Sequence, residues 1–216
     1  MVTRRDWLKG AAGMALLRDA LAAGRIEKGV YRARGEARIN GAQAKAGMEV
    51  KAGDALTTGP QGELVFVIAR DAMLVRADSR VEIAGAAGAL LETGLRIVGG
   101  AALSVFEPGK RKRISTPTAT IGIRGTGIYV EQRVDRTYVC TCYGVADLAA
   151  VDDPEARETV ETTHHDQPRY IMRKGAPHMI MTAPVVDHSD AELILLEGLV
   201  GREPLFVGAG YPATRY

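Results

Sequence analysis

The two cysteines of the chain, Cys140 and Cys142, are separated by a single residue in an otherwise apolar and aromatic run. On a β-strand, residues i and i+2 project from the same face, and their Cα atoms lie about 6.6–6.8 Å apart. This spacing is close to the upper limit of about 6.8 Å for a disulfide, so a bridge between the two would be strained. Two thiolates on one face of a strand can instead share a metal ion.

A pair of histidines, His164 and His165, follows about twenty residues later, after a polar stretch at 152–163. A Cys-Cys-His-His set suits Zn²⁺, and it also suits Cu(I) or an iron centre. The intervening loop can close because its entropic cost grows slowly with length. The alternative is that Cys140 and Cys142 are small core residues and that the two histidines belong to a turn leading to Pro168. The spacing leaves both interpretations open.

A thiol-dependent enzyme is a further alternative for the same residues. It would need an activated thiolate, an imidazole within reach and an oxyanion site, and the sequence offers candidates for the first two only. No acidic pair stands in a recognisable hydrolase context either. We therefore expect no enzymatic activity.

The C-terminal part of the chain contains two further features. His178–Met181 adds histidine and methionine side chains, but alternation along a strand would place them on opposite faces, and the methionines are expected to fill the core. Ser189 and Glu192 have the spacing of a capping box. This box predicts a helix near residues 190–200, with leucines on one face and Gly201 as its stop.

The elements that must position these residues are predicted to be short strands. The aromatic fraction is only 5% while the chain contains 25 glycines, which suits strands joined by frequent turns. Five apolar runs of strand length are separated by Gly, Asn and Asp turn signals, and the run Leu64–Ile68 is expected to be buried on both faces. Strands are predicted at 63–68, 73–75, 80–83, 95–98 and 102–106. This pattern predicts an all-β domain, either a sandwich or a β-solenoid of stacked rungs.

The first residues predict export from the cytoplasm. Arg4 and Arg5 precede a Trp-Leu-Lys run, a weakly apolar stretch at 10–17 and the small residues 20–22. This arrangement is typical of a twin-arginine signal peptide, here residues 1–23, and it predicts a periplasmic bacterial protein. The alternative is an amphipathic first helix with a basic end. No other apolar run is long enough for a transmembrane helix, so none is expected in the mature chain.

The charge balance gives no indication of nucleic-acid binding. The chain has 28 basic and 26 acidic side chains. Residues 1–22 hold four of the basic and two of the acidic ones, which leaves 24 of each sign in the rest. A neutral mature chain lacks the positive charge expected of a nucleic-acid partner.

Residues 115–130 form the most distinctive segment, which includes a Thr-Pro-x-Ala-x-x-Gly-x-Arg-Gly-Thr pattern ending at Thr126. Together with upstream motifs at 40–41, 46–47, 53–59 and 71–74, this segment resembles the FecR domain. The resemblance covers about residues 28–148 and implies a β-rich extracytoplasmic domain that senses a ligand or protein partner without catalysis. Residues 149–216 are then expected to form a small α/β extension.

The resemblance also sets limits on this chain. FecR regulators carry a cytoplasmic segment that contacts a sigma factor, whereas only nine residues precede the apolar stretch here. The chain is therefore not expected to act as an anti-sigma factor itself, and its partner, a periplasmic protein or a small ligand, remains unnamed. A phosphate-binding loop is disfavoured because the glycine-rich motif leads into another strand. Arg124, Gly125 and Thr126 are instead expected to maintain the fold, with Arg124 tying neighbouring strands and the glycine permitting a bulge.

Overall fold

The structure, a computed structural model, describes residues 28–85 and 94–210, without the side chain of Thr126. The expected signal peptide at residues 1–23 lies outside the described residues. The described part contains fourteen strands and the helix α2. The strands are β1 (Gly29–Arg34), β2 (Ala37–Ile39), β3 (Ala42–Gln43), β4 (Ala55–Thr58), β5 (Glu63–Ile68), β6 (Asp71–Val75), β7 (Arg80–Ala84), β8 (Gly94–Val105), β9 (Arg111–Ser115), β10 (Ala119–Gln132), β11 (Arg136–Ala150), β12 (Arg157–Thr162), β13 (Arg169–Met172) and β14 (Ile180–Thr182), and α2 spans Asp190–Leu199.

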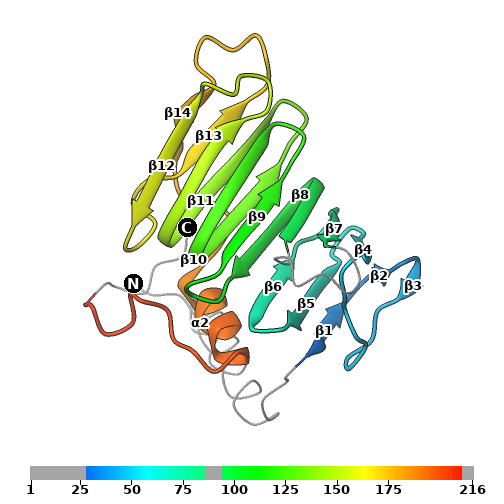
Figure 1. Ribbon diagram of the computed structural model, residues 1–216. Helices are drawn as coiled ribbons and strands as arrows, with labels where there is room; N and C mark the ends of the chain where they lie inside the picture. The colour runs from blue at the N-terminus through cyan, green and yellow to red at the C-terminus, as the bar shows by residue number, and fades with distance from the viewer. Residues whose placement is uncertain (1–27, 86–93, 211–216) are drawn as a thin grey trace, which may run out of the picture.

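The strands form one curled sheet that branches at β8 (Figure 1). The first half of β8 pairs with β7, and its second half pairs with β6 and β10. From β7 one branch runs through β4 to β2 and β3, and from β6 the other runs through β5 to β1. Beyond β10, the sheet continues through β11 to β13 and β14, and β12 also pairs with β11.

Strand β8, where the sheet branches, is longer than the sequence predicted. Separate strands were predicted at 95–98 and 102–106, but both lie in β8. Gly100 has a φ of 76°, and a Cβ atom on it would lie 2.2 Å from the Ser79 hydroxyl oxygen. The glycines therefore allow a change of direction within one strand, not a turn between two.

Two apolar clusters lie on opposite faces of the sheet. The larger one is enclosed by the two branches and by β9–β11, and it includes Leu56, Phe66 and Ile83. The second lies beneath the C-terminal helix and includes Val65, Leu103 and Tyr138. Because β5 contributes to both clusters, its central residues are buried on both faces, as the apolar run predicted.

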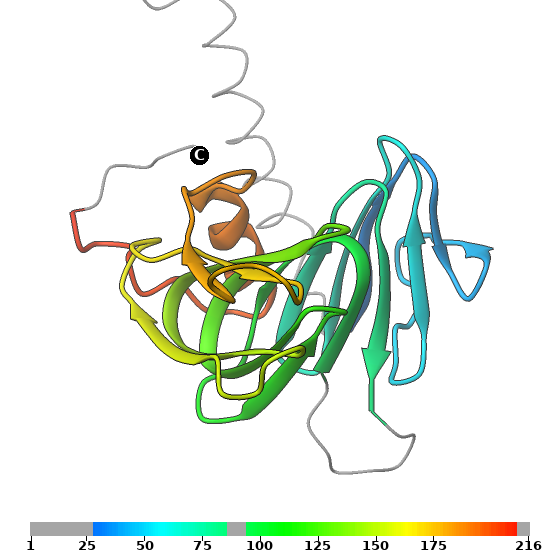
Figure 2. The same ribbon diagram turned by 90° about the horizontal axis from the view of Figure 1, so that it is seen from above.

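The helix expected near residues 190–200 is α2, and it lies on one face of the sheet beside β6 and β8 (Figures 1 and 2). The Glu192 carboxylate accepts a hydrogen bond of 2.9 Å from the backbone N–H of Ser189, as in a capping box. Gly201 follows the helix with a φ of 71°, a conformation that glycine adopts without strain.

The predicted all-β fold with a small C-terminal extension is confirmed. Of the two architectures left open, the facing branches resemble a sandwich, and the pairings among the described strands are antiparallel except for β8 with β9. A solenoid of stacked rungs would pair its strands in parallel. The expected boundary at residue 148 falls within β11, so the sheet continues into the C-terminal extension. Among the described residues, no helix is long and apolar enough to cross a membrane.

Candidate metal centre

Cys140 and Cys142 lie on β11 with both side chains in the apolar cluster beneath α2. The neighbouring residue Val139 lies in the cluster on the opposite face of the sheet. Side chains therefore alternate along β11, and the two thiols share one face of the strand, as predicted. Both are free thiols with 0% exposure. The strand therefore presents two buried sulfur atoms to the segment that packs over it.

His165 reaches this pair from the connection between β12 and β13. Its backbone N–H donates to the Cys142 carbonyl oxygen over 2.9 Å, which fixes the connection against β11. A φ of 54°, uncommon for a residue other than glycine, turns the imidazole inward. As a result, Nδ1 of His165 lies 3.4 Å from Sγ of Cys140.

His188, which the spacing of the cysteines and the histidine pair did not indicate, is the fourth residue of the set. It lies just before α2 and stacks on the ring of Tyr129, with centroids 4.8 Å apart and planes 10° from parallel. Its Nε2 atom lies 2.9 Å from Nδ1 of His165. The donor atoms of Cys140, Cys142, His165 and His188 all lie within 4.8 Å of one another, and all four residues are buried.

His164 does not join the two cysteines, so the predicted set is corrected in one member. Its ring is nearly perpendicular to that of His165, at 73°, and its Nε2 atom lies 2.9 Å from the Asp190 carboxylate. Adjacent residues in a bend direct their side chains differently, and only His165 faces the sulfurs. His164, His165 and Asp190 form a second, adjoining group of buried donor atoms.

The hydrogen bonds on the outer side of each imidazole determine which nitrogen carries the proton. The Val186 carbonyl oxygen, which can only accept, lies 2.7 Å from Nδ1 of His188. The buried Asp190 carboxylate lies 3.1 Å from Nε2 of His165. Both outer nitrogens therefore donate, and the inner Nδ1 of His165 lies within hydrogen-bond distance of both Sγ of Cys140 and Nε2 of His188. A proton on Nδ1 of a charged His165 can occupy this contact, and a metal ion can replace that proton.

The electrostatics of the thiols are asymmetric. Burial raises the pKa of Cys140, but hydrogen bonds from Cys142, His165 and His188 outweigh it and hold that pKa well below its ordinary value. Burial, together with the neighbouring Cys140 sulfur, raises the pKa of Cys142. For His165, burial lowers the pKa, but Cys140 and Asp190 outweigh it and raise the pKa. The site thus favours negative charge on sulfur and positive charge near the imidazoles.

Of the two donor separations considered, the sulfur–nitrogen distance fits a tetrahedral ion and the nitrogen–nitrogen distance is too short. Zinc bonds of about 2.3 Å to sulfur and 2.0–2.1 Å to nitrogen imply ligand separations of about 3.6 Å for sulfur to nitrogen and about 3.4 Å between nitrogens. The Cys140–His165 separation of 3.4 Å meets the first value closely. The His165–His188 separation of 2.9 Å requires the two rings to part by about 0.5 Å to reach the tetrahedral value.

A nucleophilic role for the same thiols is disfavoured by their burial. Reactive cysteines lie in partly exposed surroundings where a substrate can approach, whereas Cys140 and Cys142 are covered by the C-terminal segment. The arrangement suits a closed site that holds an ion better than a site that turns over a substrate.

The Arg124–Gly125–Thr126 motif lies on β10, where Arg124 is opposite Val145 of β11. Arg124 binds Asp147 on β11, with a shortest distance of 2.7 Å, so it does tie neighbouring strands. The two side chains are 53% and 45% exposed, however. Loss of such a solvent-exposed pair has little effect on the free energy of unfolding. Gly125 has a φ of 62° and lies where the register with β11 shifts, as expected of a bulge. The side chain of Thr126 lies outside the described part.

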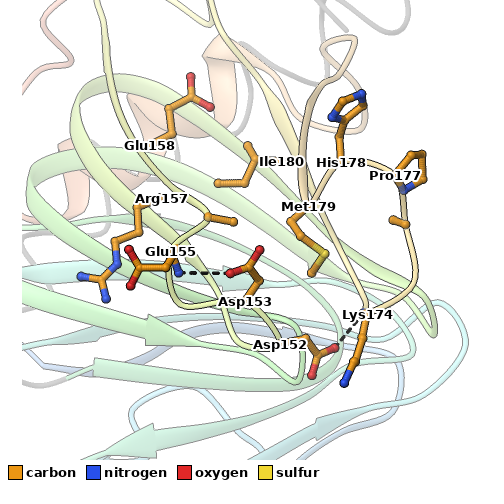
Figure 3. Close-up of a pocket in the computed structure, with 12 residues that line it drawn as sticks. Asp152, Asp153, Glu155, Arg157, Glu158, Lys174, Pro177, His178, Met179 and Ile180 are labelled. Atoms are coloured by element: carbon orange, nitrogen blue, oxygen red, sulfur yellow. Dashed lines mark hydrogen bonds between the residues drawn. The ribbon is translucent and has the colours of Figure 1, made fainter.

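A surface pocket of about 670 Å³ lies between β12 and the connection from β13 to β14 (Figure 3). Two of its carboxylates stabilise turns: Asp153 accepts from the backbone N–H of Glu155, and Asp152 accepts from that of Lys174. His178 lines the rim and is exposed. The pocket has mixed charge and no pair of catalytic groups in contact, so the cysteine cluster remains the candidate site.

Comparisons with known proteins give little that bears on this site. No protein-family model matches the chain, and no curated protein sequence matches it. The chain is similar to two crystal structures of a candidate anti-sigma factor from Parabacteroides distasonis, each with a TM-score of 0.49 and 12% sequence identity. The match covers 60% of this chain and 58% of that chain, so this chain spans little more than half of the length of the protein it matches. No residue role is transferred from it.

Proposed function

We propose that the protein is an exported binding or sensing module whose ligand is a divalent transition-metal ion, held by Cys140, Cys142, His165 and His188. The twin-arginine pattern supports a periplasmic location, and the burial of both thiols supports a role without catalysis. The resemblance of residues 115–130 to the FecR domain supports a sensing role.

The observation that carries this proposal is the pair of inward-facing imidazole nitrogens. Both outer nitrogens donate to fixed acceptors, the Val186 carbonyl and the Asp190 carboxylate, which is how metal-ligating histidines are oriented in proteins. The inner nitrogens and the two sulfurs all lie within 4.8 Å of one another.

The charge of the site favours a divalent ion. Two thiolates carry two negative charges, which an ion such as Zn²⁺ neutralises, whereas Cu(I) would leave one uncompensated charge in a buried place. Four protein ligands without an open position are typical of structural zinc sites. Zinc is therefore the first candidate among the metals that the donor set admits.

Metal analysis of the purified mature protein tests the proposal. After loading with Zn²⁺ and removal of excess metal, we expect one ion per chain in the wild type. Cys142→Ser and His188→Ala should each abolish retention, while His178→Ala, an exposed histidine outside the cluster, should not. A wild-type protein that retains no metal, or variants that retain as much as the wild type, would contradict the proposal.

The role of His164 distinguishes this site from the set predicted by sequence alone. His164→Gln should keep the metal because the imidazole lies outside the four-ligand group. Loss of the ion in His164→Gln with retention in His188→Ala would instead restore the original set of Cys140, Cys142, His164 and His165.

A further inference from the structure

The outer face of strands β9 to β12 carries arginine side chains that the proposed metal centre does not use. The four strands lie side by side and pair in antiparallel register (Figure 1). Their inward-facing residues belong to the larger apolar cluster. The outward-facing, exposed arginines are named here the arginine face, defined as Arg111 and Arg113 on β9, Arg124 on β10 and Arg157 on β12.

A hollow in this face is centred on Gly122. Gly122 lies opposite Arg113 on one side and opposite Asp147 on the other. Two pockets, of about 380 and 500 Å³, share these three residues in their lining, so the pockets adjoin. The other members of the arginine face line one pocket or the other. Because glycine has no side chain, a ligand among these arginines can approach the backbone of β10 closely.

The two carboxylates that line these pockets are already engaged by other side chains. Asp147 binds Arg124 at 2.7 Å. Hydrogen bonds from Arg124 and Thr159 lower the pKa of Asp147, and the charge of Arg111 adds to this effect. Glu158 is bound at 2.6 Å by an arginine of β13. The two carboxylates therefore leave part of the positive charge of the arginine face uncompensated.

The remaining guanidinium groups have no acidic partner at close range. In the part of the chain that the structure describes, the side chains of Arg111 and Arg113 form no hydrogen bond and no ion pair. Arg157 donates to the Pro154 carbonyl oxygen, which carries no net charge. The register also places Arg111 directly opposite Arg124, and like charges in such positions destabilise a sheet. An anion bound among them would relieve this repulsion.

We infer that the arginine face binds a ligand through oxyanions of the phosphate type. Guanidinium groups hold phosphate oxygens through paired N–H donors. A phosphate monoester carries a charge of about −1.5 to −2 at pH 7, which matches the two arginines of β9 that lack a close partner. The same chemistry is offered by a soluble phosphate compound and by the headgroup of an anionic lipid. This inference goes beyond the proposed function and does not depend on the metal centre.

Isothermal titration calorimetry with pyrophosphate tests the inference on the mature protein after treatment with a chelator, so that pyrophosphate does not act by removing a metal. The wild type should bind pyrophosphate. Arg113→Gln should weaken binding about 10- to 100-fold, the effect of losing a charged hydrogen-bond donor. Arg34→Gln is the matched control, because Arg34 is an exposed arginine on β1, in another branch of the sheet, and it should bind as the wild type.

A variant of opposite sign separates binding from folding. Asp147→Asn removes a negative charge from the lining of both pockets and should strengthen pyrophosphate binding by up to about fivefold. A variant that only damaged the fold would weaken binding instead. Circular dichroism of each variant should match the wild type, because the substituted side chains lie on the surface. Weaker binding in Asp147→Asn with an unchanged spectrum would contradict the inference.

Sedimentation with phosphatidylglycerol vesicles distinguishes the two sources of the oxyanion. Vesicle binding that pyrophosphate competes away and that Arg113→Gln reduces identifies a lipid headgroup. Pyrophosphate binding without vesicle binding identifies a soluble ligand. If the wild type binds neither probe, or if Arg34→Gln lowers the affinity as much as Arg113→Gln does, the inference is wrong. The proposed metal centre stands or fails independently of these results.

Discussion

Asp190 accepts from two imidazoles at once, His164 over 2.9 Å and His165 over 3.1 Å. It therefore orients His165 without touching the proposed ion. A carboxylate in this position fixes the tautomer of a ligating histidine and increases its basicity. The structure gives Asp190 a positioning role that the capping-box pattern alone did not indicate.

Asp190→Asn should lower zinc affinity about 10- to 100-fold, the usual effect of removing such an oriented carboxylate. Competition with a chromophoric chelator measures the change. Asp187→Asn is the matched control, because Asp187 is exposed and has a φ of 62°, which asparagine tolerates. Equal affinities for the two variants would show that Asp190 does not orient His165 for metal binding.

The pairs made by Arg124 and Lys112 differ in exposure, and this difference determines how much each contributes to the free energy of unfolding. Arg124→Ala should destabilise the protein by at most about 1 kcal/mol, because its pair with Asp147 is half exposed. Lys112→Ala should cost about 3–5 kcal/mol, because Lys112 and Asp71 are 9% and 1% exposed and the carboxylate would lose its partner. Urea denaturation of the wild type and of each variant measures the change in the free energy of unfolding. The opposite ranking would mean that the Arg-Gly-Thr motif contributes to stability beyond its surface pair.

At the scale of single elements, α2 is anchored through a pair that depends on pH. Burial raises the pKa of the Glu192 carboxyl, but Arg76, with Ser189, outweighs burial and holds that pKa below the ordinary value of 4.5. A carboxyl whose pKa is lower in the folded state stabilises the protein above its unfolded pKa, and this contribution is lost as the pH falls through the folded pKa.

The Arg76–Glu192 pair should therefore contribute to stability at pH 7 and cease to contribute below the lowered pKa. Arg76→Gln should be less stable than its parent at pH 7, and the difference should shrink as the pH decreases from about 5 toward 3. Both proteins carry Cys142→Ser, so that release of metal in acid does not affect the comparison. A difference that stays constant over this range would mean that the pair does not set the acid sensitivity of α2.

Glycines in β8 and β10 determine the path of these two strands. Gly100 redirects β8 between two branches of the sheet, and Gly125 sits at a register shift in β10, where a Cβ atom would lie 2.7 Å from the Cα of Pro108. Both positions have positive φ. The sheet can therefore branch and bulge without a loop at either place.

At the scale of the whole molecule, the proposed export route would decide where the proposed ion is acquired. The twin-arginine route carries folded proteins, so a chain that follows it can load its ion before crossing the membrane. Replacing Arg4 and Arg5 by lysines keeps the charge of the signal but should retain the protein in the cytoplasm. Fractionation of cells expressing the double variant measures this, and undiminished periplasmic protein would contradict the twin-arginine assignment.

Several features of the fold are determined by local sequence. The double burial of β5 follows from an uninterrupted apolar run, and α2 follows from the Ser189–Glu192 spacing. The placement of Cys140 and Cys142 on one face follows from strand alternation. In each case the determining interactions lie within a few residues, so the pattern alone was sufficient.

Tertiary packing decided the rest. His188 reaches the cysteines only because the C-terminal segment crosses the sheet, while His164, adjacent in sequence to a ligand, faces Asp190. Lys112 stands in the basic run 110–113 but is buried beside Asp71, a partner from a distant strand. Alternation within a strand tells which face a side chain occupies, but the segment that covers that face is selected by long-range packing. The place of His188 beside the cysteines and the burial of each charge pair are therefore determined by the tertiary structure.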